Sequence, residues 1–291
     1  MDLRRLHPWL LRASWAALAF TAGPSLAEAL DPRSAAVRTT ASALLWSGWF
    51  AGLCGALVPH PIALTVLRLV APGALVAALL AAFGSEADAR AAMGLASAVL
   101  AVLLAFAPAT GVAWVNGPAY PNERRYPLRP PTPLLFGPLE LSWAVAVGGP
   151  VAGALLLAAR QWVAGAVVLA VCLPLAALLG RSLYGLARRW VVFVPAGLVL
   201  HDPLALVDPV LFTKEHVRAL GPAEPDTDAL DLTQRAAGLV LQLTLDAPAS
   251  LLLSGPKNRS TKAVEAGSLL FLPTRPGSVL EEAAARRLPV S

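Results

Sequence analysis

Charged residues are scarce in this 291-residue chain. Asp, Glu, Lys and Arg make up 14% of the sequence and hydrophobic residues make up 57%, whereas soluble domains carry roughly 25% charged residues. Only Lys214, Lys257 and Lys262 are lysines. The mean hydropathy of +0.64 excludes an ordinary soluble protein, because a water-soluble fold could not bury so much apolar surface.

Cysteine is equally scarce, and metal and nucleotide motifs are absent from the sequence. Cys54 and Cys172 fall in apolar segments and do not form a CxxC pair, so neither a zinc site nor a redox motif is indicated. The chain also lacks the HExxH spacing of zinc proteases and the GxxxxGK[ST] spacing of phosphate loops. We therefore expect no cofactor, no metal and no catalysis.

The net charge of +5 does not indicate a nucleic-acid partner. Residues 1–188 carry 13 basic and 7 acidic residues, and residues 189–291 carry 10 basic and 11 acidic residues. The excess of positive charge thus lies in the hydrophobic part of the chain. Loop charges that orient a membrane protein explain it better than a surface for binding phosphates does.

Long hydrophobic segments follow one another as far as residue 184. A helix needs about 20 apolar residues to cross a bilayer, and six segments qualify: 9–27, 39–58, 62–83, 91–115, 139–159 and 162–184. Arg188-Arg189-Trp190 begins a polar remainder. We therefore predict a membrane all-α bundle in residues 1–188 and a small β-rich cytoplasmic domain in residues 189–291.

Arginine distribution predicts the orientation. Arginines cluster at the N-terminus, after the fourth segment and after the sixth, at Arg4, Arg5, Arg124, Arg125, Arg129, Arg181, Arg188 and Arg189. Cytoplasmic loops carry an excess of Lys and Arg, so we expect a plasma-membrane protein with both termini in the cytoplasm. If the first segment is instead a signal peptide cleaved after Ser25-Leu26-Ala27, the new N-terminus lies outside and the tail stays in the cytoplasm.

Two ionisable residues are candidates for a role at membrane depth. Arg68 lies in the third segment and Glu140 at the start of the fifth. Intramembrane charge is costly and often marks function. Alternatively, Arg68 extends its head group to the interface, and Glu140 pairs with neighbouring arginines there.

Two basic segments are candidates for binding lipid or a partner protein. The proline-rich loop Asn116–Pro138 carries Arg124, Arg125 and Arg129, and Ser254–Gly267 carries Lys257, Arg259 and Lys262. Proline excludes a helix in the first loop and holds it extended. Basic residues near a cytoplasmic leaflet attract anionic head groups. The alternative for each is a solvated connector.

The tail has the pattern of short strands. Trp190–Val194, Pro195-Ala196-Gly197 and Leu198–His201 predict a β-hairpin. A helix is expected from Pro276 or Gly277 to about Arg287, with acidic residues early and arginines late. Further strands are expected at Pro209–Lys214, His216–Leu220, Gly238–Leu245, Ser250–Leu253 and Ser268–Pro273.

Seven short strands followed by a C-terminal helix resemble bacterial pleckstrin-homology-like (bPH/GRAM-like) domains, chiefly through Arg189–Val199 and the final helix. The whole chain resembles actinobacterial multi-pass membrane proteins with such a domain. The resemblance implies a PH-like β-sandwich or barrel that serves binding or assembly without catalysis. Phosphoinositide-binding members use basic residues in the first hairpin, and Pro195-Ala196-Gly197 has none.

Three classes of function follow from these patterns. The preferred one is an integral membrane scaffold or regulatory protein whose residues 189–291 bind a protein partner or membrane lipids at the surface. The second is a small transporter or channel subunit, against which the scarcity of intramembrane polar groups argues. The third is a membrane-embedded lipid-modifying enzyme, for which the sequence offers only Glu140, His60 and Glu123.

Overall fold

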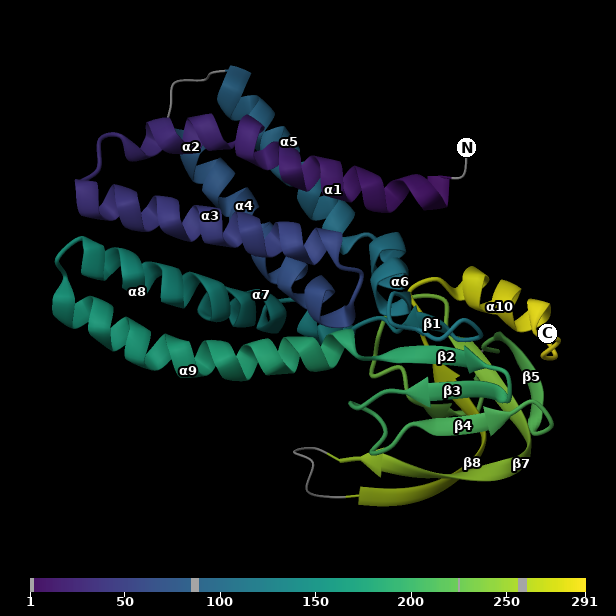
Figure 1. Cartoon of the computed structure of the whole chain (residues 1–291). Coiled ribbons are helices and arrows are strands. Elements are labelled where there is room, and N and C mark those ends of the chain that lie inside the picture. The colour runs from purple at the N-terminus through teal and green to yellow at the C-terminus, as the bar shows by residue number, and fades with distance from the viewer. Residues whose placement is uncertain (1–2, 85–88, 225, 256–260) are drawn as a thin grey trace. The chain divides into compact units, whose positions relative to one another are not determined.

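The chain folds into two compact units in the computed structural model, which describes residues 3–84, 89–224, 226–255 and 261–291 (Figure 1). The helical unit comprises Met1–Trp114 and Glu140–Tyr184. The β unit comprises Val115–Leu139 and Gly185–Ser291.

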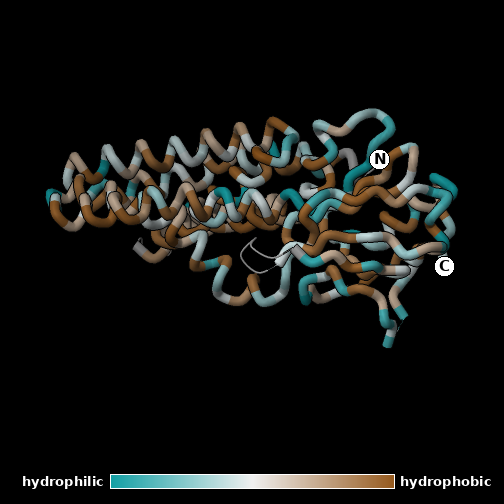
Figure 2. Tube along the Cα trace, turned by 90° about the horizontal axis from the view of Figure 1, so that it is seen from below, coloured by the Kyte–Doolittle hydropathy of each residue, from teal (hydrophilic) through white to brown (hydrophobic). Residues whose placement is uncertain are grey.

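Apolar helices dominate the first part of the chain, as the composition predicts. They are α1 (Leu3–Thr21), α2 (Gly23–Leu30), α3 (Ala35–Leu57), α4 (Pro61–Gly84), α5 (Ala89–Phe106), α6 (Pro108–Asn116), α7 (Pro138–Trp143), α8 (Gly149–Ala158) and α9 (Trp162–Ala187). Figure 2 shows the hydrophobic residues along them. Among the described residues, five helical segments are long and apolar enough to cross a membrane: Ala35–Leu57, Pro61–Phe83, Ala89–Phe106, Pro138–Ala158 and Trp162–Ala187. The protein is therefore an integral multi-pass membrane protein.

The predicted span 9–27 is not among these five. It falls on α1 and α2, and α1 carries three arginines in its 19 residues, which makes exposure to lipid costly. The helix breaks before Gly23-Pro24. α1 nevertheless packs on the other helices of its unit through three buried side chains, Leu11, Trp15 and Leu18. The described part of the chain thus has five candidate spans where the sequence predicts six.

The predicted span 91–115 is interrupted by a proline. α5 ends at Phe106 and α6 begins at Pro108, because Pro108 has no N–H to donate to the carbonyl of Leu104. The Leu104 carbonyl instead accepts the Thr110 hydroxyl at 2.6 Å and the Ala107 N–H at 3.3 Å. Side chains commonly satisfy backbone groups that a proline frees in membrane helices.

The fifth predicted span, 139–159, is helical throughout but changes pitch. Ala144–Gly148 is a π-helical segment in which the Gly149 N–H bonds to the Ala144 carbonyl. Pro150 follows directly and cannot continue the hydrogen-bond ladder. Single π-turns of this kind relieve such a local break without ending the helix.

Tryptophans and glycines set the close packing of α1 against α3. Trp15 Nε1 donates to the Trp49 carbonyl at 2.9 Å, and Trp49 Nε1 donates to the Trp15 carbonyl at 3.2 Å. The Trp15 ring occupies the space where Gly52 would carry a Cβ atom. Gly55 is also tight, since a Cβ there would lie 2.9 Å from the Ala63 carbonyl oxygen. Small residues thus let these helices approach closely.

The β unit contains two four-stranded sheets and a final helix. The first sheet has the order β1 (Arg124–Pro127), β2 (Trp190–Val194), β3 (Gly197–His201), β4 (Val210–Thr213), and its pairs are antiparallel. The second has the order β5 (Val217–Pro222), β7 (Leu241–Ser254), β8 (Thr261–Phe271), β6 (Leu230–Asp231), in which only the β6–β8 pair is parallel. The helix α10 (Pro276–Ala285) closes the chain.

Most of the strands coincide with the predicted ones. The hairpin of β2 and β3 and the final helix are confirmed, and Pro209–Lys214 and His216–Leu220 contain most of β4 and β5. The two strands predicted at 238–245 and 250–253 form one strand, β7, with an irregularity between Thr244 and Ala249. β8 is longer than expected, and the short strand β6 falls in a segment predicted to be a polar break.

The loop between the fourth and fifth predicted spans contributes a strand to the β unit. Residues 124–127 are extended, as the prolines predict, and pair with β2 as the edge strand β1. The predicted boundary at residues 188 and 189 places this loop in the membrane domain, whereas its contacts group residues 115–139 with the β unit. Because the partner strand lies more than 60 residues later in the chain, the local sequence carries no sign of the pairing.

The packing of α3 yields a matched pair of substitutions. We expect Gly52→Ala to lower the free energy of unfolding by about 1–3 kcal/mol, because the new methyl group overlaps the Trp15 ring. Gly48→Ala, in the same helix, meets nothing within 4 Å and should leave stability nearly unchanged. Unfolding of the purified protein by sodium dodecyl sulfate measures both, and equal effects would contradict the packing described.

Candidate functional site

A buried ion pair joins the start of β2 to the end of β3. Arg189 Nε donates to Asp202 Oδ1 at 2.7 Å, and Arg189 Nη2 donates to Asp202 Oδ2 at 2.6 Å. Both side chains are 1% exposed. The Leu204 N–H also donates to Asp202 Oδ1, at 3.1 Å. A bidentate pair of this kind fixes orientation, and its burial is tolerated because the remaining polar atoms have partners.

The same arginine holds the segment that follows β1. Arg189 Nη1 donates to the Arg129 carbonyl at 2.9 Å, and the Leu128 N–H donates to the Arg189 carbonyl at 2.9 Å. The Arg129 N–H donates to the Leu272 carbonyl at 2.8 Å. The loop segment is therefore fixed both to the start of β2 and to the end of β8.

The inner face of the first sheet packs against α10. The Tyr126 hydroxyl donates to Glu282 Oε2 at 3.4 Å, and Arg286 Nε donates to Glu282 Oε1 at 2.6 Å. Burial, followed by the negative charge of Glu282, raises the pKa of Tyr126 to about 12. The Tyr126 and Phe193 rings meet edge to face at 5.9 Å. This face is thus closed by aromatic and charged groups that already have partners.

The outer face of the same sheet carries a shallow pocket of about 240 Å³. In the antiparallel register Arg125 lies opposite Val192, and Trp190 lies opposite His201. Side chains alternate along a strand, so these residues share one face. We call this the outer-face pocket; its lining residues are Glu123, Arg125, Arg188, Trp190, Val192, Val194, Val199, His201 and Pro209.

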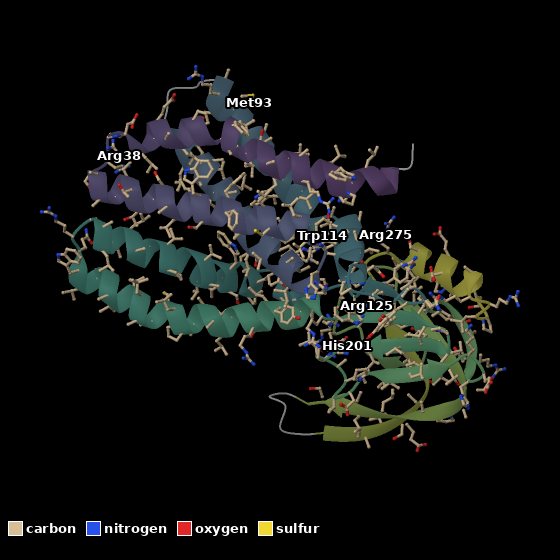
Figure 3. All side chains as sticks on the ribbon, viewed as in Figure 1. Arg38, Met93, Trp114, Arg125, His201 and Arg275 are labelled. Atoms are coloured by element: carbon tan, nitrogen blue, oxygen red, sulfur yellow. The ribbon has the colours of Figure 1, made fainter. Side chains whose placement is uncertain are left out.

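Three of the lining side chains are stacked on one another. The Arg125 guanidinium carbon lies 5.4 Å from the centre of the Trp190 ring, within the range of a cation–π interaction. On the neighbouring strand, the His201 ring stacks on Trp190 with centroids 5.3 Å apart and planes 29° apart. Figure 3 labels Arg125 and His201 at this end of the sheet. Arg125, Trp190 and His201 therefore form a cationic and aromatic wall.

His201 is half-buried in the pocket wall. Burial and the positive charges of Arg188 and Arg125 lower the pKa of its imidazole, partly opposed by Asp202. Its Nε2 atom is buried and has no hydrogen-bond partner among the described residues. Buried polar atoms are nearly always paired, so this nitrogen is an exception, and its burial keeps it out of reach of a molecule in the pocket.

The charge of Arg125 is balanced by Glu123. Arg125 Nε donates to Glu123 Oε1 at 2.8 Å and Nη2 donates to Oε2 at 3.2 Å. This hydrogen-bonded pair lowers the pKa of Glu123. The side chains are 17% and 14% exposed, so Arg125 is oriented by Glu123 while its guanidinium still lines the pocket.

The structure separates the three arginines predicted as a basic patch. Arg125 lines the outer-face pocket. Arg124 is exposed and lies opposite Phe193 in the register, and therefore on the other face of β1. Arg129 is exposed too, but its Nη1 donates to the Ala237 carbonyl at 3.1 Å.

The second predicted basic segment is described only in part. Lys262 is exposed near the start of β8, opposite Leu253 of β7. Lys257 and Arg259 lie outside the described residues.

The two predicted intramembrane residues differ in their surroundings. Arg68 Nε donates to the Ala105 carbonyl at 3.2 Å, and its guanidinium lies 5.6 Å from the Phe106 ring centre. It therefore binds the C-terminal end of α5, where a cation is favourable. Glu140 is exposed in the first turn of α7, where a carboxylate suits the helix dipole.

Of the nine lining residues, only Arg125 was predicted to bind a ligand, and Glu123 was considered only as a catalytic candidate. Arg188, Trp190 and His201 were not predicted as binding residues. The predicted hairpin contained a signal for two of them, because a turn at Pro195–Gly197 aligns Trp190 with His201 across the strand pair. No such signal existed for Glu123, which reaches the pocket only through the β1–β2 pairing.

Among the described residues, no group of three or more His, Cys, Asp or Glu side chains could hold a metal ion. The pocket contains an ion pair, aromatic rings and valines, which suit binding of a partly apolar group. Comparisons with protein-family models, curated proteins and solved structures found no match.

The buried ion pair can be tested through stability. We expect Asp202→Leu to destabilise the β unit by about 3–5 kcal/mol, because Arg189 would be left as a buried, unpaired charge. The double substitution Arg189→Met and Asp202→Leu should recover most of that loss, and Arg218→Met, at an exposed position of β5, should cost little. Pulse proteolysis of the full chain in urea measures each variant; a double variant no better than Asp202→Leu would contradict this account.

Proposed function

We propose that the protein is an integral membrane scaffold or regulatory protein whose β unit is a non-catalytic binding module. The module binds a protein partner or the membrane surface. The membrane helices anchor the module and limit its orientation.

One observation carries this proposal: the strands β1 and β2 pair although a helical hairpin lies between them in the sequence. Two candidate spans, Pro138–Ala158 and Trp162–Ala187, are inserted between the paired strands. The module is therefore connected to the membrane helices at more than one point of the chain. A single flexible tether would serve capture from bulk solution, whereas several short connections suit binding at a defined place on the membrane surface.

The arginine distribution and the even number of spans between β1 and β2 support a cytoplasmic position of the β unit. The two spans between β1 and β2 return the chain to the same side of the bilayer, and arginines lie at both ends of that segment: Arg124, Arg125, Arg129, Arg181, Arg188 and Arg189. The positive-inside rule favours the cytoplasm for such segments. The plasma membrane is the corresponding site in a bacterium.

The order of elements in the β unit supports a relation to bacterial pleckstrin-homology-like domains. The hairpin β2–β3, the strand β4, the long strands of the second sheet and the closing helix α10 follow in that order. β1, supplied from the loop between spans, is an addition to that plan. Domains of this type bind and assemble, which agrees with the scaffold proposal and with the actinobacterial resemblance.

Arg68 argues against the alternative of a transporter. A solute pathway requires polar groups directed into the helix bundle, whereas the Arg68 guanidinium is used by the end of α5. The outer-face pocket also gives little support to the enzyme alternative. Its lining contains no Ser, Thr, Cys or Lys side chain that could act as a nucleophile.

Native mass spectrometry of the full chain tests the proposal. The protein is extracted from its own host in mild detergent, and we expect a stoichiometric protein partner or a retained lipid. Arg124→Glu with Arg125→Glu should remove that species, while Arg218→Glu on β5 should not. A bare chain, or a complex that the β1 variant leaves unchanged, would contradict the proposed function.

A further inference from the structure

A strained turn lies between the strands β6 and β7. It runs from Thr233 to Ala236, and the Ala236 N–H donates to the Thr233 carbonyl at 3.1 Å. Its two central residues have positive φ angles, 56° at Gln234 and 60° at Arg235. Turns with two such residues normally carry Gly, Asn or Asp there, because other side chains are strained in the left-handed conformation. The sequence Gln234-Arg235 therefore disfavours the turn that it forms, which we call the strained turn.

The chain at the start of the strained turn is fixed to the second sheet. The Leu232 N–H donates to the Leu270 carbonyl at 3.0 Å. The Thr233 N–H donates to Asp231 Oδ1 at 2.7 Å. Leu232 and Thr233 are both buried, so the start of the turn cannot move to relieve the strain.

The chain after the strained turn is held by the loop that follows β1. The Ala237 N–H donates to the Thr132 hydroxyl oxygen at 2.8 Å, and Arg129 Nη1 donates to the Ala237 carbonyl at 3.1 Å. Gly238 leaves room for that guanidinium, since a Cβ atom there would lie 3.3 Å from Arg129 Cζ. Both ends of the turn are therefore fixed, and its conformation is imposed by the surrounding structure.

The strained turn presents side chains that the fold does not use. Gln234 and Arg235 are exposed, and neither side chain forms a hydrogen bond or an ion pair with another described residue. The exposed guanidinium of Arg129 has no acidic partner in the described part of the chain either. Strained backbone that contributes nothing to packing is typical of sites that bind. We therefore looked for a ligand that fits these groups.

The exposed groups match a carboxylate-rich peptide. Guanidinium groups bind carboxylates with paired hydrogen bonds, and arginine is common at the energetic centres of protein interfaces. The Gln234 amide can both donate and accept, as a peptide backbone does. Leu239, one residue after Gly238, is 55% exposed and adds apolar surface. A polyphosphate would satisfy the arginines but would offer no donor to the amide oxygen.

We propose that the strained turn docks an acidic peptide segment of a partner protein, in which Arg235 and Arg129 bind carboxylates and Gln234 binds the peptide backbone. The inference deepens the proposed function, on which it rests, by locating the partner-binding surface and stating the chemistry of the partner.

Fluorescence anisotropy with the purified full chain in detergent tests the proposal. The probe is a labelled peptide of alternating Glu and Ser residues, and the control peptide has Gln in place of every Glu. We expect the acidic peptide to bind at one saturable site and the control peptide not to bind. Equal binding of the two peptides, or displacement of the acidic peptide by oligothymidylate at equal total charge, would overturn recognition of an acidic peptide.

Two variants separate binding from strain. Arg235→Gln keeps a strained residue but removes the charge, so peptide affinity should fall about tenfold, as expected for lost hydrogen bonds to a charged group, with an unchanged urea midpoint. Gln234→Asn with Arg235→Gly supplies the Asn-Gly sequence that such turns prefer. This variant should unfold at higher urea in pulse proteolysis and yet bind the peptide at least as weakly as Arg235→Gln. The matched control is Arg218→Gln, at an exposed position of β5, which should change neither property.

The outcomes distinguish the docking surface from the proposed function. Equal peptide affinities in the wild type and Arg235→Gln would overturn the docking surface, and an Asn-Gly variant no more stable than the wild type would contradict the strain. If native mass spectrometry still finds a bound partner in either case, the proposed function survives. If peptide binding depends on Arg235 but the chain retains no partner or lipid from its host, the proposed function fails and the turn remains a peptide-binding surface.

Discussion

The β unit depends on the buried ion pair between Arg189 and Asp202. The guanidinium lies two residues after the end of α9 and is almost inaccessible to solvent, and it binds a carboxylate at the end of β3 and the carbonyl of Arg129 in the loop between spans. A charge placed there without partners would cost several kcal/mol, so the three segments must meet for any of them to fold. The outer-face pocket depends on the same contacts, because Arg125 and Trp190 lie side by side only if β1 and β2 keep their register.

In the helical unit, too, buried polar groups need partners, but the surrounding solvent is the lipid bilayer. A lipid bilayer offers no water to a carbonyl that loses its partner. Pro108 cannot donate to the Leu104 carbonyl, which accepts the Thr110 hydroxyl and the Ala107 N–H instead. Arg68 donates to the Ala105 carbonyl at the end of α5. Indole N–H groups complete the pattern by donating across helices to backbone carbonyls: Trp15 to Trp49, Trp114 to Gly55 and Trp143 to Leu69. The sparse polar groups of this unit serve its backbone.

Local periodicity predicted much of the fold, and long-range pairing accounts for the rest. Five apolar helices and the hairpin Trp190–His201 were evident in the sequence because each depends on residues close together in the chain. The interruption at Pro108 was hidden inside a segment that is hydrophobic on both sides. β1 could not be predicted, since Arg124–Pro127 becomes a strand only by pairing with β2 across an inserted helical hairpin. For the same reason, the sequence did not predict that Arg125 and Glu123 share a pocket with His201.

The insertion of a helical hairpin between two paired strands gives the pocket a property that a contiguous domain would lack. Glu123 and Arg125 precede the hairpin in the chain, whereas Arg188 and Trp190 follow it, and all four line one pocket. A ligand held by both pairs gains contacts only while β1 and β2 are paired. By linkage, strand pairing must then strengthen ligand binding by the same factor as ligand binding strengthens strand pairing. Any displacement of the ends of the hairpin that strains β1 against β2 therefore changes affinity at the pocket, and a ligand there opposes such a displacement.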